Sequence, residues 1–163
     1  MEHEAAALFN SLQESAFAAS VRQSVWIYPA ANIGHIVALV CFAGAIAIMD
    51  FRLLGGMRHC APAQLIGRAR WYAAIALIGL ITTGFILFSA EAGHVVANPV
   101  FQAKMALIAA GFINILVYEF GAKRAVQAVP PGAALPRSAF LAGIFSLTIW
   151  ITVAALGRLI AYV

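Results

Sequence analysis

The residue best suited to chemistry is His35, which lies deep within a long uncharged stretch of sequence. This stretch runs from Gln23 to Met49. With a helical rise of about 1.5 Å per residue, His35 lies about 13 Å past Trp26, an aromatic residue of the kind found at membrane surfaces. A neutral imidazole that uses one nitrogen for a hydrogen bond keeps the other for iron, copper or a proton. A polar group at this depth is costly, which favours a functional role over packing against a neighbouring helix.

Further polar residues are expected at a similar depth. Asn32 precedes His35 by three residues, which places both side chains on one helix face. Lys104 is near the start of the third apolar stretch, Arg158 ends the fourth, and Arg22 precedes the first, so their charges are placed to neutralise an anionic ligand. We therefore predict a site for haem b or a quinone, in which His35 is the haem-iron ligand or the quinone's hydrogen-bond partner. The alternative for Lys104 is that its ammonium group extends to the lipid headgroups.

Other residues of the types that bind metals are few, and they are dispersed along the sequence. His94 follows the second apolar stretch and is a candidate for a second axial ligand of haem. Cys41, Met57, Cys60 and Met105 are soft ligands of the kind that suits Cu(I), which leaves a copper-handling protein as an alternative. The two cysteines are too few for a disulfide framework or a zinc site.

Asp50 and Arg52 follow the first apolar stretch directly. Charges at such a boundary are typical of anchors at the headgroup level. We expect them there, paired with each other, with Arg70 or with Glu119.

The composition excludes several classes of protein. The chain has 163 residues, of which 64% are hydrophobic and 10% charged, whereas soluble domains are roughly 45–50% apolar and about 25% charged. The formal net charge of +4 is dispersed along the chain, so no single basic face is available to follow a nucleic-acid backbone. The chain is expected to be a membrane protein, with the lipid bilayer and other membrane subunits as its partners and no nucleic acid.

The apolar stretches predict the elements that position these residues. Transmembrane helices are expected over 23–49, 71–90, 99–119 and 138–158, because about 20 apolar residues cross the hydrocarbon core and lipid leaves no partner for an unpaired backbone. Residues 4–20 form an amphipathic pattern, with Ala5, Leu8 and Leu12 on the apolar side, which predicts a helix at the membrane interface or a docking surface. The expected fold is all-α: one membrane domain over 1–163, a four-helix bundle with an N-terminal interfacial helix.

Lysine and arginine also predict the orientation. Arg58 and Arg68 lie between the first two apolar stretches, and Lys123 and Arg137 lie between the last two. The positive-inside rule places both segments in the cytoplasm and both termini outside, in a bacterial inner membrane. The first residues are acidic and lack a basic n-region, so no cleavable signal peptide is expected.

Several motifs carry a resemblance to a known group of proteins. They are Ser24-Val25-Trp26-Ile27-Tyr28-Pro29, His35, Asp50-Phe51-Arg52-Leu53-Leu54-Gly55, Thr83-Gly84-Phe85-Ile86-Leu87-Phe88, Asn98-Pro99-Val100-Phe101 with Lys104, Asn114, and Gly157-Arg158-Leu159-Ile160-Ala161-Tyr162. With these the chain resembles a bacterial family of uncharacterised four-span inner-membrane proteins, whose members usually carry a histidine where this chain has Tyr118. More distantly it is similar to the membrane domain of copper-resistance protein D and to the haem-b membrane protoporphyrinogen oxidase, in which His35 and Lys104 have counterparts. The likeness to the oxidase implies haem ligation by His35.

Three functions are compatible with these features. The first is a b-type haem or quinone-site subunit that moves electrons between the membrane and a partner protein. The second is a structural or assembly subunit of a larger membrane complex, with no bound cofactor. The third is a copper-handling membrane protein.

Overall fold

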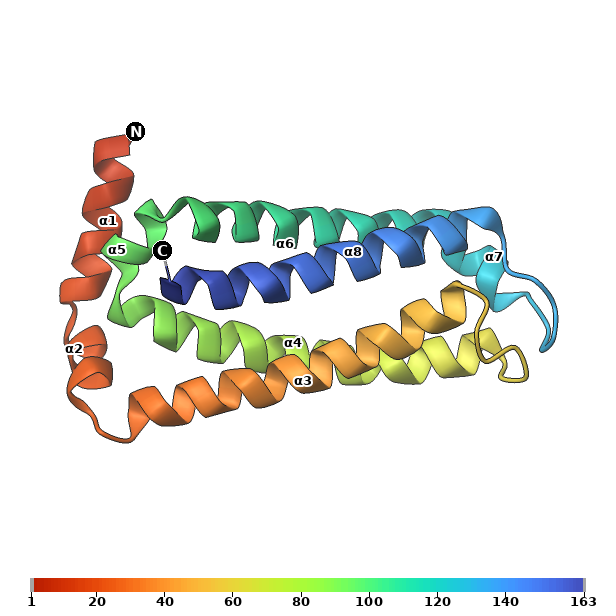
Figure 1. Cartoon of the computed structure of the whole chain (residues 1–163), viewed down its shortest axis with the longest axis horizontal. Coiled ribbons are helices and arrows are strands. Elements are labelled where there is room, and N and C mark those ends of the chain that lie inside the picture. Colours follow the sequence, from red (N-terminus) through yellow and green to blue (C-terminus); the bar gives the residue numbers. More distant parts are fainter. Residues whose placement is uncertain (1, 163) are drawn as a thin grey trace.

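The computed structural model describes residues 2–162, with the side chains of residues 7–160 and 162. The described chain is helical throughout, with no strand in it. Four long helices dominate: α3 (Ile27–Leu53), α4 (Pro62–Ala90), α6 (Pro99–Val117) and α8 (Arg137–Leu159) (Figure 1). The shorter elements are α1 (Glu2–Glu14), α2 (Ala16–Gln23), α5 (Ala92–Ala97), the π-helical turn η1 (Tyr118–Ala122), α7 (Lys123–Gln127) and the 3₁₀ turn η2 (Ile160–Tyr162).

All four long helices have the length and apolar composition needed to cross a membrane. Their outward side chains are strongly apolar, as one residue from each helix shows: Val40, Ile78, Ile113 and Ile151 are each more than 60% exposed. Such surfaces are stable in lipid and unfavourable in water. The predicted four-helix membrane bundle is therefore confirmed.

The ends of these helices extend beyond the uncharged stretches. α4 begins at Pro62, nine residues before the predicted start at Trp71, because proline suits the first helical position and charged side chains are tolerated outside the hydrocarbon. The third long helix continues from Pro99 through the π-helical turn to Gln127, whereas we predicted an end at Glu119. α3 ends at Leu53, beyond the predicted Met49, where Gly55 adopts the left-handed conformation, with φ +94°, that commonly terminates a helix.

The long helices associate in two pairs. α3 packs along α4, α6 packs along α8, and α8 also contacts α3 (Figure 1). Small residues permit these close approaches: a Cβ added to Gly79 would lie 3.3 Å from Ala38 Cβ, and one added to Gly111 would lie 3.0 Å from the Trp150 ring. We call the end that carries the chain termini the terminal end, and the end with the α3–α4 and α7–α8 connections the loop end.

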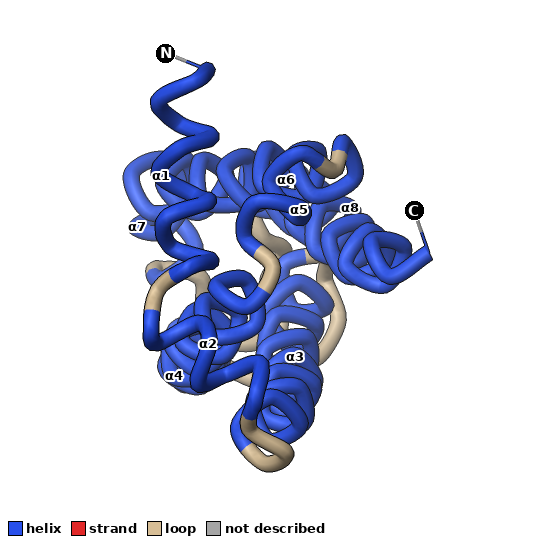
Figure 2. Tube along the Cα trace, turned by 90° about the vertical axis from the view of Figure 1, so that its left-hand side faces the viewer, coloured by secondary structure: helices blue, strands red, loops and turns tan. Residues whose placement is uncertain are grey.

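The N-terminal segment is two helices, where we predicted one over residues 4–20. Ser15 separates them, because its side chain accepts a hydrogen bond from the Ala18 N–H and so caps α2. Both helices lie across the terminal end of the bundle (Figure 2). Arg22 fixes them there by donating to the Gln13 carbonyl at 2.7 Å and to the Ala90 carbonyl at 2.9 Å. The side chain of Ala5, expected on the apolar face, lies outside the described side chains.

Candidate functional site

His35 lies between α3 and α4, where Thr83 holds its ring. The imidazole Nδ1 is 2.9 Å from the Thr83 Oγ1, and that hydroxyl donates its only proton to the Gly79 carbonyl at 2.6 Å. Thr83 therefore has no second proton to give, so Nδ1 must be the donor of the His35–Thr83 hydrogen bond. In the neutral ring this assigns the lone pair to Nε2.

The sequence around Thr83 creates this arrangement. Gly79 lies four residues before Thr83, the spacing at which a threonine hydroxyl bonds back to a helix carbonyl. Gly84 leaves room for the ring, since a Cβ added there would lie 3.3 Å from the His35 Cε1. The Leu80 carbonyl also lies close to the imidazole. Two turns of α4 thus fix one side of the histidine.

The Nε2 of His35 remains available. The hydrogen bond resolved for the ring is that of Nδ1 with Thr83, and the Leu80 carbonyl is a second acceptor beside the ring. Nε2 is also not sealed in the interior, because the buried side-chain nitrogens and oxygens that lack a partner in residues 7–160 belong to Asp50 and Arg52. A nitrogen with a free lone pair and open access can accept a proton or bind a metal.

Lys104 is the charged residue that we consider as a partner of His35 in this site. It lies in the second turn of α6, a helix that begins at Pro99 because the Asn98 side chain caps the Val100 and Phe101 N–H groups. Its ammonium group lies over α8, 3.4 Å from the position of a Cβ added to Gly157. It is close enough to His35 to act on the ring electrostatically. No carboxylate of the described residues pairs with it.

The remaining predicted site residues lie elsewhere. Asn32 is exposed and makes no hydrogen bond within the described chain. Arg158 is exposed and turns toward Tyr162, whose hydroxyl it contacts at 2.5 Å and whose ring centre lies 4.8 Å from its guanidinium carbon. His94 is an exposed residue of the short helix α5. Of the predicted set, Lys104 is the residue that influences His35 electrostatically, and no hydrogen bond joins the two within the described residues.

Of the soft metal ligands, Met57 and Cys60 share the α3–α4 connection, where the Cys60 N–H donates to the Met57 carbonyl at 3.0 Å, while Cys41 lies on α3 and Met105 on α6. Cys41 and Cys60 are both exposed free thiols, and Met105 is 47% exposed. Within the described residues no group of three histidine, cysteine, aspartate or glutamate side chains is placed to hold a metal ion. No arrangement of this kind favours copper handling.

The expected pairing of Asp50 and Arg52 with each other, with Arg70 or with Glu119 is not found among the described residues, and both side chains are buried. Asp50 is 2% exposed and Arg52 is 0% exposed, and the two do not pair with each other. Asp50 instead lies within reach of the Ser146 hydroxyl on α8. The two charges are two residues apart on one helix, which already implied that they point to different sides.

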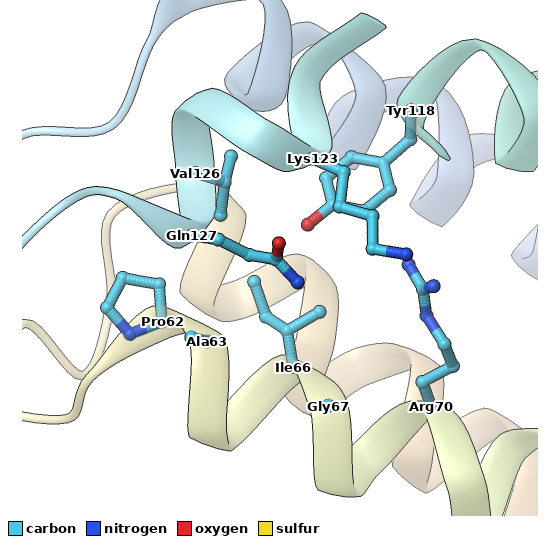
Figure 3. A pocket seen from close by; sticks show the side chains of 9 residues that line it. All are labelled: Pro62, Ala63, Ile66, Gly67, Arg70, Tyr118, Lys123, Val126 and Gln127. Atoms are coloured by element: carbon cyan, nitrogen blue, oxygen red, sulfur yellow. The ribbon is translucent and has the colours of Figure 1, made fainter. Parts of the chain in front are cut away.

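The other charges at the loop end form a cluster around Glu119. Its carboxylate accepts from Arg70 of α4 at 2.5 Å and from Lys123 of α7, while the Arg70 guanidinium also lies 5.7 Å from the centre of the Tyr118 ring. A cavity of about 210 Å³ opens beside them, between α4 and α7, with Gln127 on its wall (Figure 3). These contacts tie the third long helix to α4, and Arg70 and Glu119, each expected as a partner of Asp50 or Arg52, pair with each other instead.

The fold and these polar groups define a class: a small multi-pass membrane protein whose helices enclose partner-free polar side chains. Comparison with known families places it more narrowly. The model of a family of unknown function, DUF6644, matches residues 14–163, and the chain belongs to this family. No curated protein and no solved structure matches it, so similarity to copper-resistance protein D or to protoporphyrinogen oxidase is not shown.

Proposed function

We propose that the protein is a membrane electron-transfer subunit that binds a quinone head group between His35 and Lys104. One observation carries the proposal: a histidine ring oriented by Thr83 and a lysine without a counter-charge among the described residues are near enough to interact electrostatically. Polar groups in an apolar slab are costly when unpaired, so a ligand that satisfies both stabilises the site.

A quinone matches this pair because it supplies a carbonyl acceptor when oxidised and a hydroxyl donor when reduced. The Lys104 ammonium donates to the carbonyl oxygen of the oxidised form. The His35 Nε2 would accept a hydrogen bond from a hydroxyl of the reduced form. Throughout, Nδ1 keeps its bond to Thr83, so the ring stays oriented.

Haem b is the second candidate, and the orientation of His35 favours it. A metal-bound histidine typically donates its other ring N–H to a fixed acceptor, as Nδ1 does to Thr83. Nε2 would then be one axial ligand and Lys104 would pair with a propionate, in line with the distant resemblance to the haem-b oxidase. The described membrane-spanning helices offer no second imidazole, because His94 lies on α5 and His59 in the α3–α4 connection. A quinone therefore fits this site better than haem b does, because it needs no second imidazole beside His35 and Lys104.

The protein purified in a neutral detergent tests both ligands. Organic extraction should recover a co-purifying quinone, and a short-chain ubiquinone should bind when it is titrated into the depleted protein. His35→Gln and Lys104→Met should each weaken this binding by about tenfold or more, since each removes a hydrogen bond that involves a charged or otherwise unpaired group. His59→Gln, at an exposed histidine, and Arg124→Met, at an exposed cation, are the matched controls.

The absorption spectrum separates the candidates. A Soret band that disappears in His35→Gln identifies haem b and rejects the quinone. If neither a Soret band nor quinone binding is found, both proposals fail, and the structural or assembly subunit and the copper-handling protein are the remaining functions.

We also propose a location in a bacterial inner membrane, with the loop end in the cytoplasm. Seven cationic side chains lie at or near this end: Arg52, Arg58, Arg68, Arg70, Lys123, Arg124 and Arg137. Such an excess is typical of the cytoplasmic side of a membrane protein, and it leaves both termini on the other side.

A further inference from the structure

A second cavity lies at the loop end, and it shares no lining residue with the cavity beside Glu119. It has a volume of about 220 Å³ and lies between the end of α3 and the segment that leads into α8. Its walls include Leu54, Leu135 and Phe140, and its polar side chains are Arg52 and Arg58. Since one water molecule takes up about 30 Å³, this space holds a group of several heavy atoms.

Arg52 is the unusual member of this cavity. The residue is 0% exposed, yet none of its three guanidinium nitrogens has a hydrogen-bond partner in the described chain. Arginine does not lose its proton in proteins, so the burial cost cannot be avoided by neutralisation. A buried charge with no counter-charge is strongly destabilising, which indicates that an anion completes this site.

The surroundings of Arg52 favour an anion over any other ligand. Arg58 adds a second guanidinium, held in place by the donation of its Nε to the Gly55 carbonyl at 3.1 Å. No acidic side chain lines the cavity, and Asp50 is turned to Ser146.

The backbone around the cavity is fixed independently of Arg52. The Gly132 N–H donates to the Arg58 carbonyl at 2.8 Å, which ties the α7–α8 connection to the α3–α4 connection. Gly132 and Gly55 both adopt positive φ angles, of +86° and +94°, that favour glycine. The cavity is thus shaped by two connections that are held together, and the guanidinium of Arg52 is not needed to close it.

We propose that this cavity binds a phosphate group through Arg52 and Arg58. The planar guanidinium matches two phosphate oxygens at once, a geometry that recurs at phosphate sites. The group comes either from an anionic phospholipid, which is abundant at the charged end of a membrane bundle, or from free phosphate in solution. The two sources share the same contacts and differ in whether acyl chains accompany the phosphate.

The test compares Arg52→Met with Arg68→Met in the full-length, detergent-purified protein. Methionine keeps much of the length of the arginine side chain and removes the charge, and Arg68 is an exposed arginine at the same end that lines neither cavity. Thermal unfolding is followed after removal of lipid, and again with inorganic phosphate or with phosphatidylglycerol added. Phosphatidylcholine serves as the zwitterionic control lipid, and native mass spectrometry counts the lipids retained.

We expect the wild-type chain and Arg68→Met to gain thermal stability with one of the two phosphate sources. Arg52→Met should lose that gain, with binding weakened about tenfold or more. A gain with phosphatidylglycerol alone identifies a lipid site, and a gain with inorganic phosphate alone identifies a soluble anion. Stabilisation of Arg52→Met equal to that of wild type overturns the proposal, as does the absence of any gain in wild type.

Arg52→Met also has a readout that needs no ligand. In lipid-free protein, this substitution should leave the melting temperature unchanged or raise it, because it removes a buried charge without a partner. A fall in melting temperature in the absence of phosphate and lipid would show that the guanidinium bonds within the chain, which overturns the proposal. Each outcome is independent of quinone binding at the opposite end of the bundle.

Discussion

Replacing Thr83 with valine is the sharpest perturbation of the His35 site. Valine has the shape of threonine and keeps the Cγ2 that packs against Gly34, where an added Cβ would lie 3.3 Å away. The substitution removes the hydroxyl that accepts from His35 Nδ1 at 2.9 Å. It therefore tests the hydrogen bond with little change in packing.

The magnitude follows from the position of this bond between two membrane helices. Interhelical hydrogen bonds in membranes contribute about 0.6 kcal/mol on average and about 1.7 kcal/mol at most. Because the Leu80 carbonyl is close to the ring and available as a substitute acceptor, we expect a loss in the lower half of that range. Re-orientation of the ring toward Leu80 moves Nε2, and loss of such a positioning partner typically weakens ligand binding by about 10- to 100-fold.

The assay measures both quantities on the same samples. Denaturant titration in mixed micelles gives the free energy of unfolding, and titration with a short-chain ubiquinone gives the affinity. Thr82→Val is the matched control, because the Thr82 side chain is exposed and makes no hydrogen bond with the described residues. Wild-type affinity in Thr83→Val would refute a positioning role for Thr83, and equal stability losses in the two variants would refute the interhelical bond.

Three further predictions concern packing, charge and orientation. Gly111→Val should lower the free energy of unfolding by about 1–3 kcal/mol, because a Cβ already lies 3.0 Å from the Trp150 ring. Gly44→Val, where nothing lies within 4 Å of the added Cβ, should be nearly neutral, and equal losses would contradict the packing argument. Glu119→Gln should lower the free energy of unfolding by about 1 kcal/mol at low salt and by less at high salt, because the ion pairs of Glu119 are partly exposed. Thermal unfolding at two ionic strengths measures this loss, and a loss that does not depend on salt would contradict the prediction. Cys60 should react with a membrane-impermeant maleimide only after spheroplasts are lysed, with Cys60→Ser as the control, and labelling of intact spheroplasts would reverse the proposed orientation.

The four long helices were predictable because length and apolar content decide whether a segment can cross lipid. Their ends were not, since the uncharged stretch marks the hydrocarbon and a helix continues past it. Pro62 illustrates this: α4 starts there, well before Trp71, and carries Arg68 and Arg70 on its first turns. The break at Ser15 was missed because an amphipathic pattern continues through a capped interruption.

The candidate site was predictable only in part, for geometric reasons. His35 and Lys104 were identified as polar residues deep in the apolar stretches. The spacing of residues along a helix does not show, however, which of them lie within the contact with a neighbouring helix. Asn32 is rotated about 60° from His35 on the helix, and that rotation takes it out of the α3–α4 contact and leaves it exposed. The burial of Arg52 depends on how two distant connections fold together, which local sequence does not encode.

The π-helical turn at Tyr118–Ala122 affects how relatives should be aligned with this chain. The Lys123 N–H bonds to the Tyr118 carbonyl five residues back, so this turn holds one residue more than an α-helical turn. Deleting a residue here would restore α-helical geometry and rotate all that follows by about 100° relative to the preceding helix. Homologues without the bulge therefore need a single-residue gap at this point. An ungapped alignment would pair residues that lie about 100° apart around the helix.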